Sequence, residues 1–174
     1  MARLPIIVAP DPRLKGEALP VNVVDDEVRS LMDDMQETMY DANGIGLAAP
    51  QVGVMKRVII VDVAPVDGKR EPFAMVNPEV IWESDVIITK EEGCLSLPDH
   101  YAEVDRPETI KIRYLDRENE IREMDADGML ATCVQHEIDH LDGVLFVDHT
   151  SSLKRNMILR KLTKAKRQGT LVTA

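Results

Sequence analysis

Residues 135–140 contain the pattern His-Glu-x-x-His, which constrains this chain more than any other feature. In a helix, His136 and His140 are four residues apart and lie on one face. Two imidazoles so placed can bind one metal ion, and Glu137 can accept a proton from metal-bound water. Asp127 can cap this helix. Its apolar stripe would comprise Met129, Leu130, Cys133, Val134, Ile138 and Leu141. The alternative is an ordinary amphipathic helix, in which the spacing of the two histidines and the glutamate would be a coincidence.

A catalytic metal usually has three protein ligands and one open position, so a third ligand is needed. The metzincin pattern would place a histidine where Phe146 stands. The thermolysin-like pattern needs a glutamate after Glu137, and the chain has none there. The third ligand must therefore come from upstream, or from an aspartate or His149 further on.

Two cysteines are candidates for this ligand. Cys133 precedes His136 by three residues but His140 by seven, roughly 10 Å along a helix axis. Because metal–ligand bonds measure only about 2.0–2.3 Å, Cys133 is better interpreted as a small apolar residue beside the metal. Cys94 lies between strand-like segments, and a loop or strand end can present its thiolate to a distant helix. Its alternative is a buried free thiol.

The remaining pattern predicts an α+β fold with mostly antiparallel strands. A helix is expected from Asp25 or Asp26 to Asn43-Gly44, because apolar residues recur at i, i+3, i+4, i+7 and i+11. Residues 44–51 favour neither helix nor strand and permit close approach of the backbone. The expected strands are residues 58–63, 73–78, 79–89, 110–115, 120–124 and 144–147. A last amphipathic helix over 151–168 would bury Leu153, Met157, Ile158, Leu162 and Ala165.

The length of 174 residues suits a single domain over residues 1–174. Two cysteines, Cys94 and Cys133, argue against a disulfide framework and favour a reducing cytoplasm. The N-terminal apolar run is too short for a signal peptide, and no run is long enough to span a membrane. The sequence therefore predicts a cytoplasmic protein.

Charge is divided unevenly along the chain. Residues 1–148 carry 14 basic and all 31 acidic side chains, a net charge of −17, while the remainder carries +7. The basic residues of this tail are Lys154, Arg155, Arg160, Lys161, Lys164, Lys166 and Arg167. Such a tail is attracted to RNA phosphates although the body is repelled. The alternative is a solvated helix whose charges serve solubility.

Three separated motifs resemble those of the peptide deformylase family, in that family's order. They are Gly44-Ile45-Gly46-Leu47-Ala48-Ala49-Pro50-Gln51, Glu92-Gly93-Cys94-Leu95-Ser96 and Gln135-His136-Glu137-Ile138-Asp139-His140. The resemblance runs from about residue 6 to the C-terminal helix, and three ordered motifs are far more specific than His-Glu-x-x-His alone. It implies mostly antiparallel sheets packed around a central metal-binding helix, with a helix at the C-terminus.

The resemblance implies an enzyme that removes the formyl group from the N-terminal formylmethionine of nascent bacterial polypeptides. The roles implied by position are Cys94, His136 and His140 as metal ligands, Glu137 as general acid/base, Gln51 and the backbone N–H of Leu95 as oxyanion donors, Ile45 and Gly46 along the substrate backbone, and Met129, Cys133 and His136 around the methionine side chain. A metal-bound hydroxide would attack the formyl carbon, and Glu137 would return the proton to the leaving amine.

One thiolate and two imidazoles suit Zn²⁺, Ni²⁺, Co²⁺ or Fe²⁺, and the resemblance favours one Fe²⁺ per chain. It also implies a monomer whose basic C-terminal helix docks on the ribosome. Two positions depart from the family: Tyr101 replaces an arginine common after the cysteine motif, and Thr132 replaces an aliphatic residue on the pocket wall. Two other interpretations remain, an internal-bond metallopeptidase and a metal-stabilised, non-catalytic RNA-associated protein.

Overall fold

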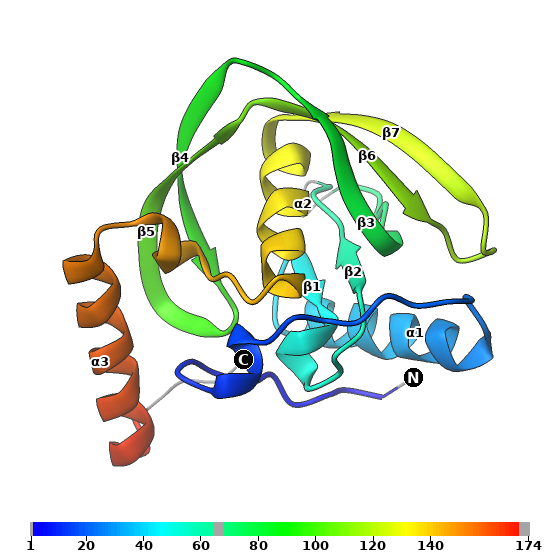
Figure 1. The fold of residues 1–174 in the computed structure, drawn as a ribbon. Helices are drawn as coiled ribbons and strands as arrows, with labels where there is room; N and C mark the ends of the chain where they lie inside the picture. Colours follow the sequence, from blue (N-terminus) through cyan, green and yellow to red (C-terminus); the bar gives the residue numbers. More distant parts are fainter. Residues whose placement is uncertain (1, 65–67, 171–174) are drawn as a thin grey trace.

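The central element of the fold is a helix, α2 (Gly128–Leu141), which two antiparallel sheets surround (Figure 1). The computed structural model describes residues 2–64 and 68–170. The larger sheet has the strand order β1-β2-β3-β6-β7, and the smaller one pairs β4 with β5. The strands are β1 (Gly46–Ala48), β2 (Val58–Val61), β3 (Phe73–Glu83), β4 (Ile87–Cys94), β5 (Leu97–Pro107), β6 (Thr109–Leu115) and β7 (Ile121–Asp127). This arrangement confirms the predicted α+β fold.

Helix α1 (Asp26–Asp41) forms where the periodicity places it. The side chain of Asp25 accepts a hydrogen bond from the backbone N–H of Val28 and so caps the first turn. Met32, Met35 and Met39 are fully buried against β1 and β2. Past the last turn, Asn43 adopts a positive φ of 56°, which ends the helix.

Helix α2 buries one side against the larger sheet. Ala131, Val134 and Leu141 join a core that includes Ile59 and Met75. Asp127 stands at the N-cap position, although its side chain makes no capping hydrogen bond. The 3.6-residue periodicity therefore leaves the histidine-bearing side of α2 free to face β4 and β5.

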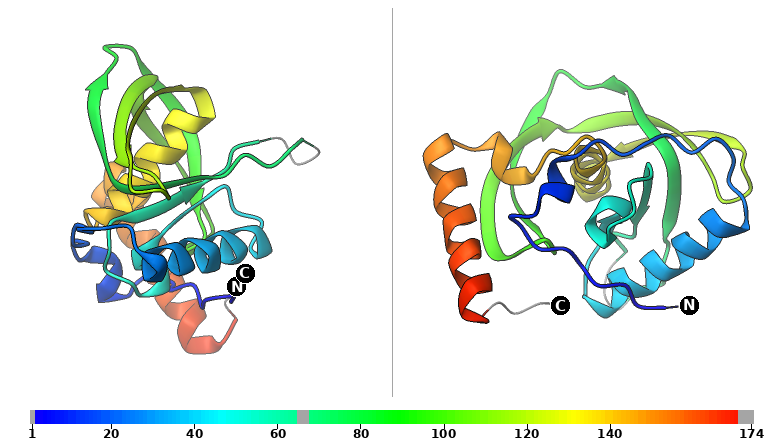
Figure 2. Two further views of the ribbon diagram at one scale, coloured as in Figure 1. Left: turned by 90° about the vertical axis from the view of Figure 1, so that its right-hand side faces the viewer. Right: turned by 60° about the horizontal axis from the view of Figure 1, so that its bottom comes forward.

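A second core joins the smaller sheet to the C-terminal helix, α3 (Ser152–Gln168). Phe146 is buried at its centre, and Ile158 and Leu162 of α3 cover it from outside. Figure 2 shows α3 at the edge of the molecule, with most of its circumference away from the body. Three short 3-10 helices complete the fold: η1 (Pro12–Lys15), η2 (Ala49–Val52) and η3 (Phe146–His149).

Two strand predictions were wrong. Residues 144–147 form no strand: they lead into η3, where the Asp148 carboxylate accepts a hydrogen bond from the backbone N–H of Leu145 and favours a tight turn. Residues 79–89 are not one separate strand. β3 continues through Pro78 to Glu83 by way of a register shift, and a new strand, β4, starts at Ile87.

The prediction of which residues α3 buries was also partly wrong. Leu153 is 81% exposed and Met157 45% exposed, whereas Ile158 and Leu162 are buried. The helix touches the body along a narrow line of residues four apart, so its first turn extends beyond the core it covers. No helix in the described ranges has the length and hydrophobicity needed to cross a membrane.

Candidate active site

Three side chains from two structural units meet beside α2. Cys94 ends β4, and His136 and His140 lie one turn apart on α2. Their candidate ligand atoms lie within 4.8 Å of one another, and Cys94 Sγ is 3.3 Å from His140 Nε2. Two ligand atoms of one tetrahedral ion, each bonded at about 2.0–2.3 Å, lie roughly 3.3–3.8 Å apart. The donor set and its spacing therefore fit one divalent ion.

Burial and the neighbouring groups shift the pKa values of the two histidines in opposite directions. Burial lowers the pKa of His136, but hydrogen bonds with Cys94 and Glu92 outweigh it and raise the pKa well above its usual range. Burial, followed by repulsion from His136, lowers the pKa of His140 well below its usual range. A ligand imidazole must be neutral, so an ion entering this site would displace the proton from His136.

The carboxylate of Glu137 is buried beside this cluster. The residue is 3% exposed, and Oε1 lies 3.9 Å from His136 Nε2. Among the described residues, Oε2 has no hydrogen-bond partner. Burial raises the pKa of Glu137 to about 7. A carboxyl group with a pKa near neutrality can both accept and return a proton.

The side-chain amide of Gln51 is oriented by its own neighbours. Its Oε1 accepts a hydrogen bond from the backbone N–H of Ala48 at 2.9 Å. Its Nε2 consequently points to Ser96 Oγ at 3.0 Å and Cys94 Sγ at 3.5 Å. The buried amide thus presents donors beside the cysteine, where negative charge on a reacting oxygen would develop.

A cavity of about 350 Å³ opens onto these groups. All but His140 of the ten residues predicted for the site line it: Ile45, Gly46, Gln51, Cys94, Leu95, Met129, Cys133, His136 and Glu137. Cys133 lies outside the three-residue cluster and donates from Sγ to the backbone carbonyl of Ile45 at 3.4 Å. The two departures from the family pattern, Tyr101 and Thr132, also line the cavity.

Gly46 permits a close approach between β1 and α2. A Cβ at this position would lie 2.7 Å from Cys133 Sγ and 2.8 Å from Glu137 Oε1. The chain can bring β1 this close to α2 only because residue 46 has no side chain.

Sequence reasoning missed a buried ion pair behind the cluster. The Glu92 carboxylate receives two hydrogen bonds from Arg106 and lies 2.9 Å from His136 Nδ1. Burial raises the pKa of Glu92, but the bonds from Arg106 and His136 lower it to about 2. The position of Glu92, two residues before Cys94 and on the same strand face, was a usable signal. The sequence held no comparable signal for Arg106.

Comparison with known proteins places this geometry in a family. A sequence profile of the polypeptide deformylase family matches residues 3–156. The chain belongs to this family. A peptide deformylase from Methylocella silvestris is 57% identical over 92% of the chain and 84% of its own length. Membership of the polypeptide deformylases decides against the non-catalytic interpretation and against an internal-bond peptidase.

Solved deformylase structures share the fold. The crystal structure of peptide deformylase from Ehrlichia chaffeensis superposes with a TM-score of 0.92 at 37% identity, covering 98% of this chain and 100% of that one. A Met-Ala-Ser-bound structure of a class I type b peptide deformylase from Acinetobacter baumannii gives 0.80 at 39% identity, covering 86% and 99%. The resemblance noted in the sequence is thus confirmed.

Proposed function

We propose that this enzyme removes the N-formyl group from the N-terminal formylmethionine of nascent polypeptides and releases formate. The observation that carries the proposal is the convergence of Cys94, His136 and His140 with a buried Glu137 in one cavity, in a chain of the deformylase family. The peptide Met-Ala-Ser in the Acinetobacter baumannii structure has the sequence of a deformylated N-terminus, which supports a substrate beginning with methionine.

The metal site would be held by Cys94, His136 and His140, and Fe²⁺ is the ion we propose, with Zn²⁺, Ni²⁺ or Co²⁺ as replacements. When bound, a divalent ion lowers the pKa of water to about 7 and polarises the formyl oxygen. Glu92 accepts at His136 Nδ1 and so leaves Nε2 of that ring as the ligand atom.

The remaining residues act on the substrate. Glu137 takes a proton from the attacking water and returns it to the leaving amine. The Gln51 amide, held by Ala48, donates to the formyl oxygen as charge builds on it, together with the backbone N–H of Leu95. The carbonyl end of this amide is already anchored, so its Nε2 is held beside Cys94 before the substrate binds.

The cavity would orient the peptide. Ile45 and Gly46, at the start of β1, lie along the substrate backbone, while Met129, Cys133 and His136 surround the methionine side chain. These walls are mainly apolar, which suits an unbranched thioether side chain. We assign this role to residues 1–174 acting as one monomeric catalytic domain in the cytoplasm.

Formate release from formyl-Met-Ala-Ser tests this function. The protein would be purified without oxygen and reconstituted with Fe²⁺ or Ni²⁺, and metal content would be measured on the same sample. We expect rapid formate release from this peptide and much slower release of acetate from acetyl-Met-Ala-Ser. Absence of formate from protein with one metal ion per chain would overturn the proposal.

Tyr101 should change the preference for residues after methionine. Its side chain is 58% exposed at the cavity, and its ring lies against Gly93, where a Cβ would be 2.6 Å from Cε1. This fixed aromatic surface should favour aromatic side chains at the second or third position by about two- to tenfold in kcat/KM, from stacking of about 0.5–1.5 kcal/mol. Tyr101→Arg should lose that preference and favour acidic residues instead.

Kinetics on formyl-Met peptides that differ at these two positions measure the effect. Tyr101→Phe is the matched control, because it keeps the ring, and its preference should equal that of wild type. An unchanged order of substrates in Tyr101→Arg would contradict the role of Tyr101.

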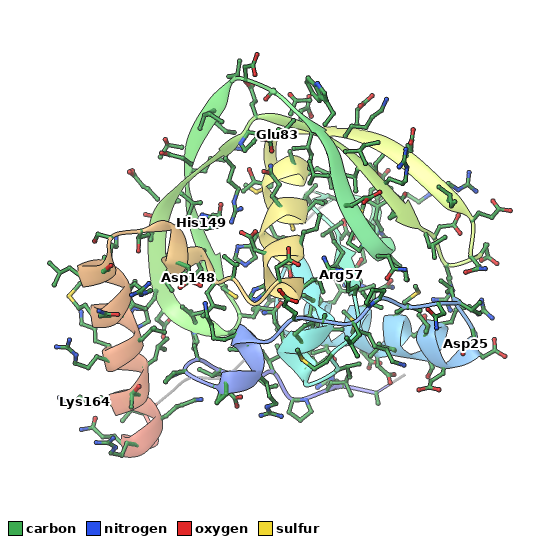
Figure 3. All side chains as sticks on the ribbon, viewed as in Figure 1. Asp25, Arg57, Glu83, Asp148, His149 and Lys164 are labelled. Atoms are coloured by element: carbon green, nitrogen blue, oxygen red, sulfur yellow. The ribbon has the colours of Figure 1, made fainter. Side chains whose placement is uncertain are left out.

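We also propose that α3 contacts the ribosome. Lys154, Lys161 and Lys164 are exposed on α3, where Figure 3 labels Lys164, and Met157 is exposed on the same helix. Basic side chains on the free side of a peripheral helix can neutralise RNA phosphates, whereas the acidic body cannot.

Cosedimentation with ribosomes should fall steeply with salt and be lost in the double variant Lys161→Glu/Lys164→Glu. Ile158 and Leu162, which attach α3 to the body, stay unchanged in this variant. The control Lys69→Glu/Lys111→Glu alters the net charge equally on the body and should still bind. Equal binding by all three proteins, or binding that survives truncation after Thr150, would refute the contact.

A further inference from the structure

A chain of hydrogen-bonded polar side chains runs from the cluster to η3. His136 Nδ1 lies 2.9 Å from Glu92 Oε1, and Arg106 donates to both oxygens of Glu92 at 2.6 and 2.9 Å. The remaining Nη1 of Arg106 donates to Asp139 Oδ2 at 2.9 Å. The same oxygen is 2.8 Å from His149 Nε2. One guanidinium therefore binds two carboxylates, and the second carboxylate is shared with a histidine.

These residues come from four elements. Two of them, β4 and β5, are paired strands, whereas the other two are helices outside both sheets. Glu92 is on β4, Arg106 on β5, Asp139 on α2 and His149 on η3, where Figure 3 labels His149. Arg106 is 5% exposed. A buried ion pair adds little net stability, because desolvation offsets the attraction, but it tolerates only one geometry. The cluster is suited to fixing the relative positions of β4 and α2.

That relative position is what the metal site requires. Cys94 lies two residues after Glu92 on β4, whereas His136 and His140 belong to α2. A shift of the strand against the helix would separate the cysteine from both imidazoles. We call the group of Glu92, Arg106, Asp139 and His149 the clamp. Within α2, Asp139 directly precedes His140, so the bond from Arg106 to Asp139 connects the His140 end of the helix to this clamp.

We infer that Asp139 and His149 are positioning residues for the metal site, acting through Arg106 to hold the strand of Cys94 against α2. The inference rests on the proposed metal site but not on the reaction. His149, on η3, holds the Asp139 carboxylate through a second contact besides the one with Arg106. Loss of this anchor weakens metal retention without removing a ligand.

The test compares two aspartates of one helix end in the full-length protein loaded with Co²⁺. Asp139→Asn weakens the contact with Arg106, whereas Asp142→Asn weakens an Arg57–Asp142 pair of the same 2.9 Å length outside the clamp. We expect Co²⁺ transfer to a chelator to be about tenfold faster in Asp139→Asn, the lower end of second-layer effects on metal sites. The thiolate-to-cobalt absorption band should shift in this variant. Asp142→Asn should match wild type in both measurements.

His149 supplies a second pair of variants at a partly exposed position. His149→Phe should lose Co²⁺ several-fold faster than wild type, and His149→Gln, whose amide can still donate to Asp139, should recover most of the retention. Melting of the metal-free proteins would show whether each variant folds. If Asp139→Asn does not fold, the Phe and Gln variants decide alone.

The outcomes separate this inference from the proposed function. Equal Co²⁺ loss by Asp139→Asn, Asp142→Asn and wild type would overturn the positioning role, as would equal acceleration in both aspartate variants. If His149→Gln lost Co²⁺ as fast as His149→Phe, the proposed role of His149 in holding Asp139 would be refuted. Wild-type protein that binds Co²⁺ but releases no formate would refute the function and leave the clamp intact.

Discussion

Replacement of Glu137 by glutamine should lower kcat for formate release by about 10²- to 10⁴-fold, the usual contribution of a general acid/base. The amide keeps the size of the side chain but cannot accept the proton of the attacking water. Burial holds the pKa of Glu137 at about 7, so that in the wild type the carboxylate can accept a proton and give it back at neutral pH. KM should change little, since the effect concerns the transition state.

Two measurements guard this interpretation. Metal content must stay at that of wild type, because Glu137 is not among the three clustered ligands. Glu103→Gln makes the same chemical change on an exposed position of β5 and should leave kcat within about twofold. A Glu137→Gln protein that keeps wild-type kcat with full metal content would remove this residue from the mechanism.

Gly46→Ala should lower kcat/KM by about 10²-fold, the cost of moving a catalytic group by about 1 Å. The new methyl group would lie 2.8 Å from Glu137 Oε1 and 2.7 Å from Cys133 Sγ, so both side chains must move. Overpacking of this kind costs about 1–3 kcal/mol of stability, which a thermal melt detects. The fall in kcat/KM should be larger than the fall in the fraction of folded protein.

Gly16→Ala is the matched control, because its Cβ would come closest to the flexible end of Met55, at 3.1 Å and away from the cavity. Its kcat/KM should equal that of wild type. Adding Cys133→Ala to Gly46→Ala removes one of the two close contacts and should recover part of the activity. Full activity in Gly46→Ala alone would show that β1 and α2 can separate without disturbing Glu137.

Local sequence signals predicted the elements that depend on nearby residues. The Asp25 cap and the methionine stripe define α1, and the spacing of two histidines and an acid places three groups on α2. The hairpin of β6 and β7 follows from alternation around a polar turn, at which Asp116 accepts hydrogen bonds from the backbone N–H groups of Glu118 and Glu120. Each of these features is decided within a few residues of chain.

Features that depend on distant contacts were not predictable in the same way. Residues 144–147 have the composition of a strand, yet they pair with no strand of the described ranges, and Asp148 stabilises a tight turn. Leu153 and Met157 carry the right periodicity, but the core ends before it reaches them. Arg106 lies 14 residues from Glu92 and 33 from Asp139, so only the fold reveals their contact.

The three candidate metal ligands come from two elements, Cys94 from β4 and both histidines from α2, and this affects the stability of the protein. In the described ranges, the β4–β5 sheet shares no strand pairing with the larger sheet, and Cys94 is 46 residues from His140. An ion bound by both elements cross-links them, and a ligand that binds only the folded chain stabilises it by mass action. Chains without the ion would then unfold more readily and be more open to proteolysis.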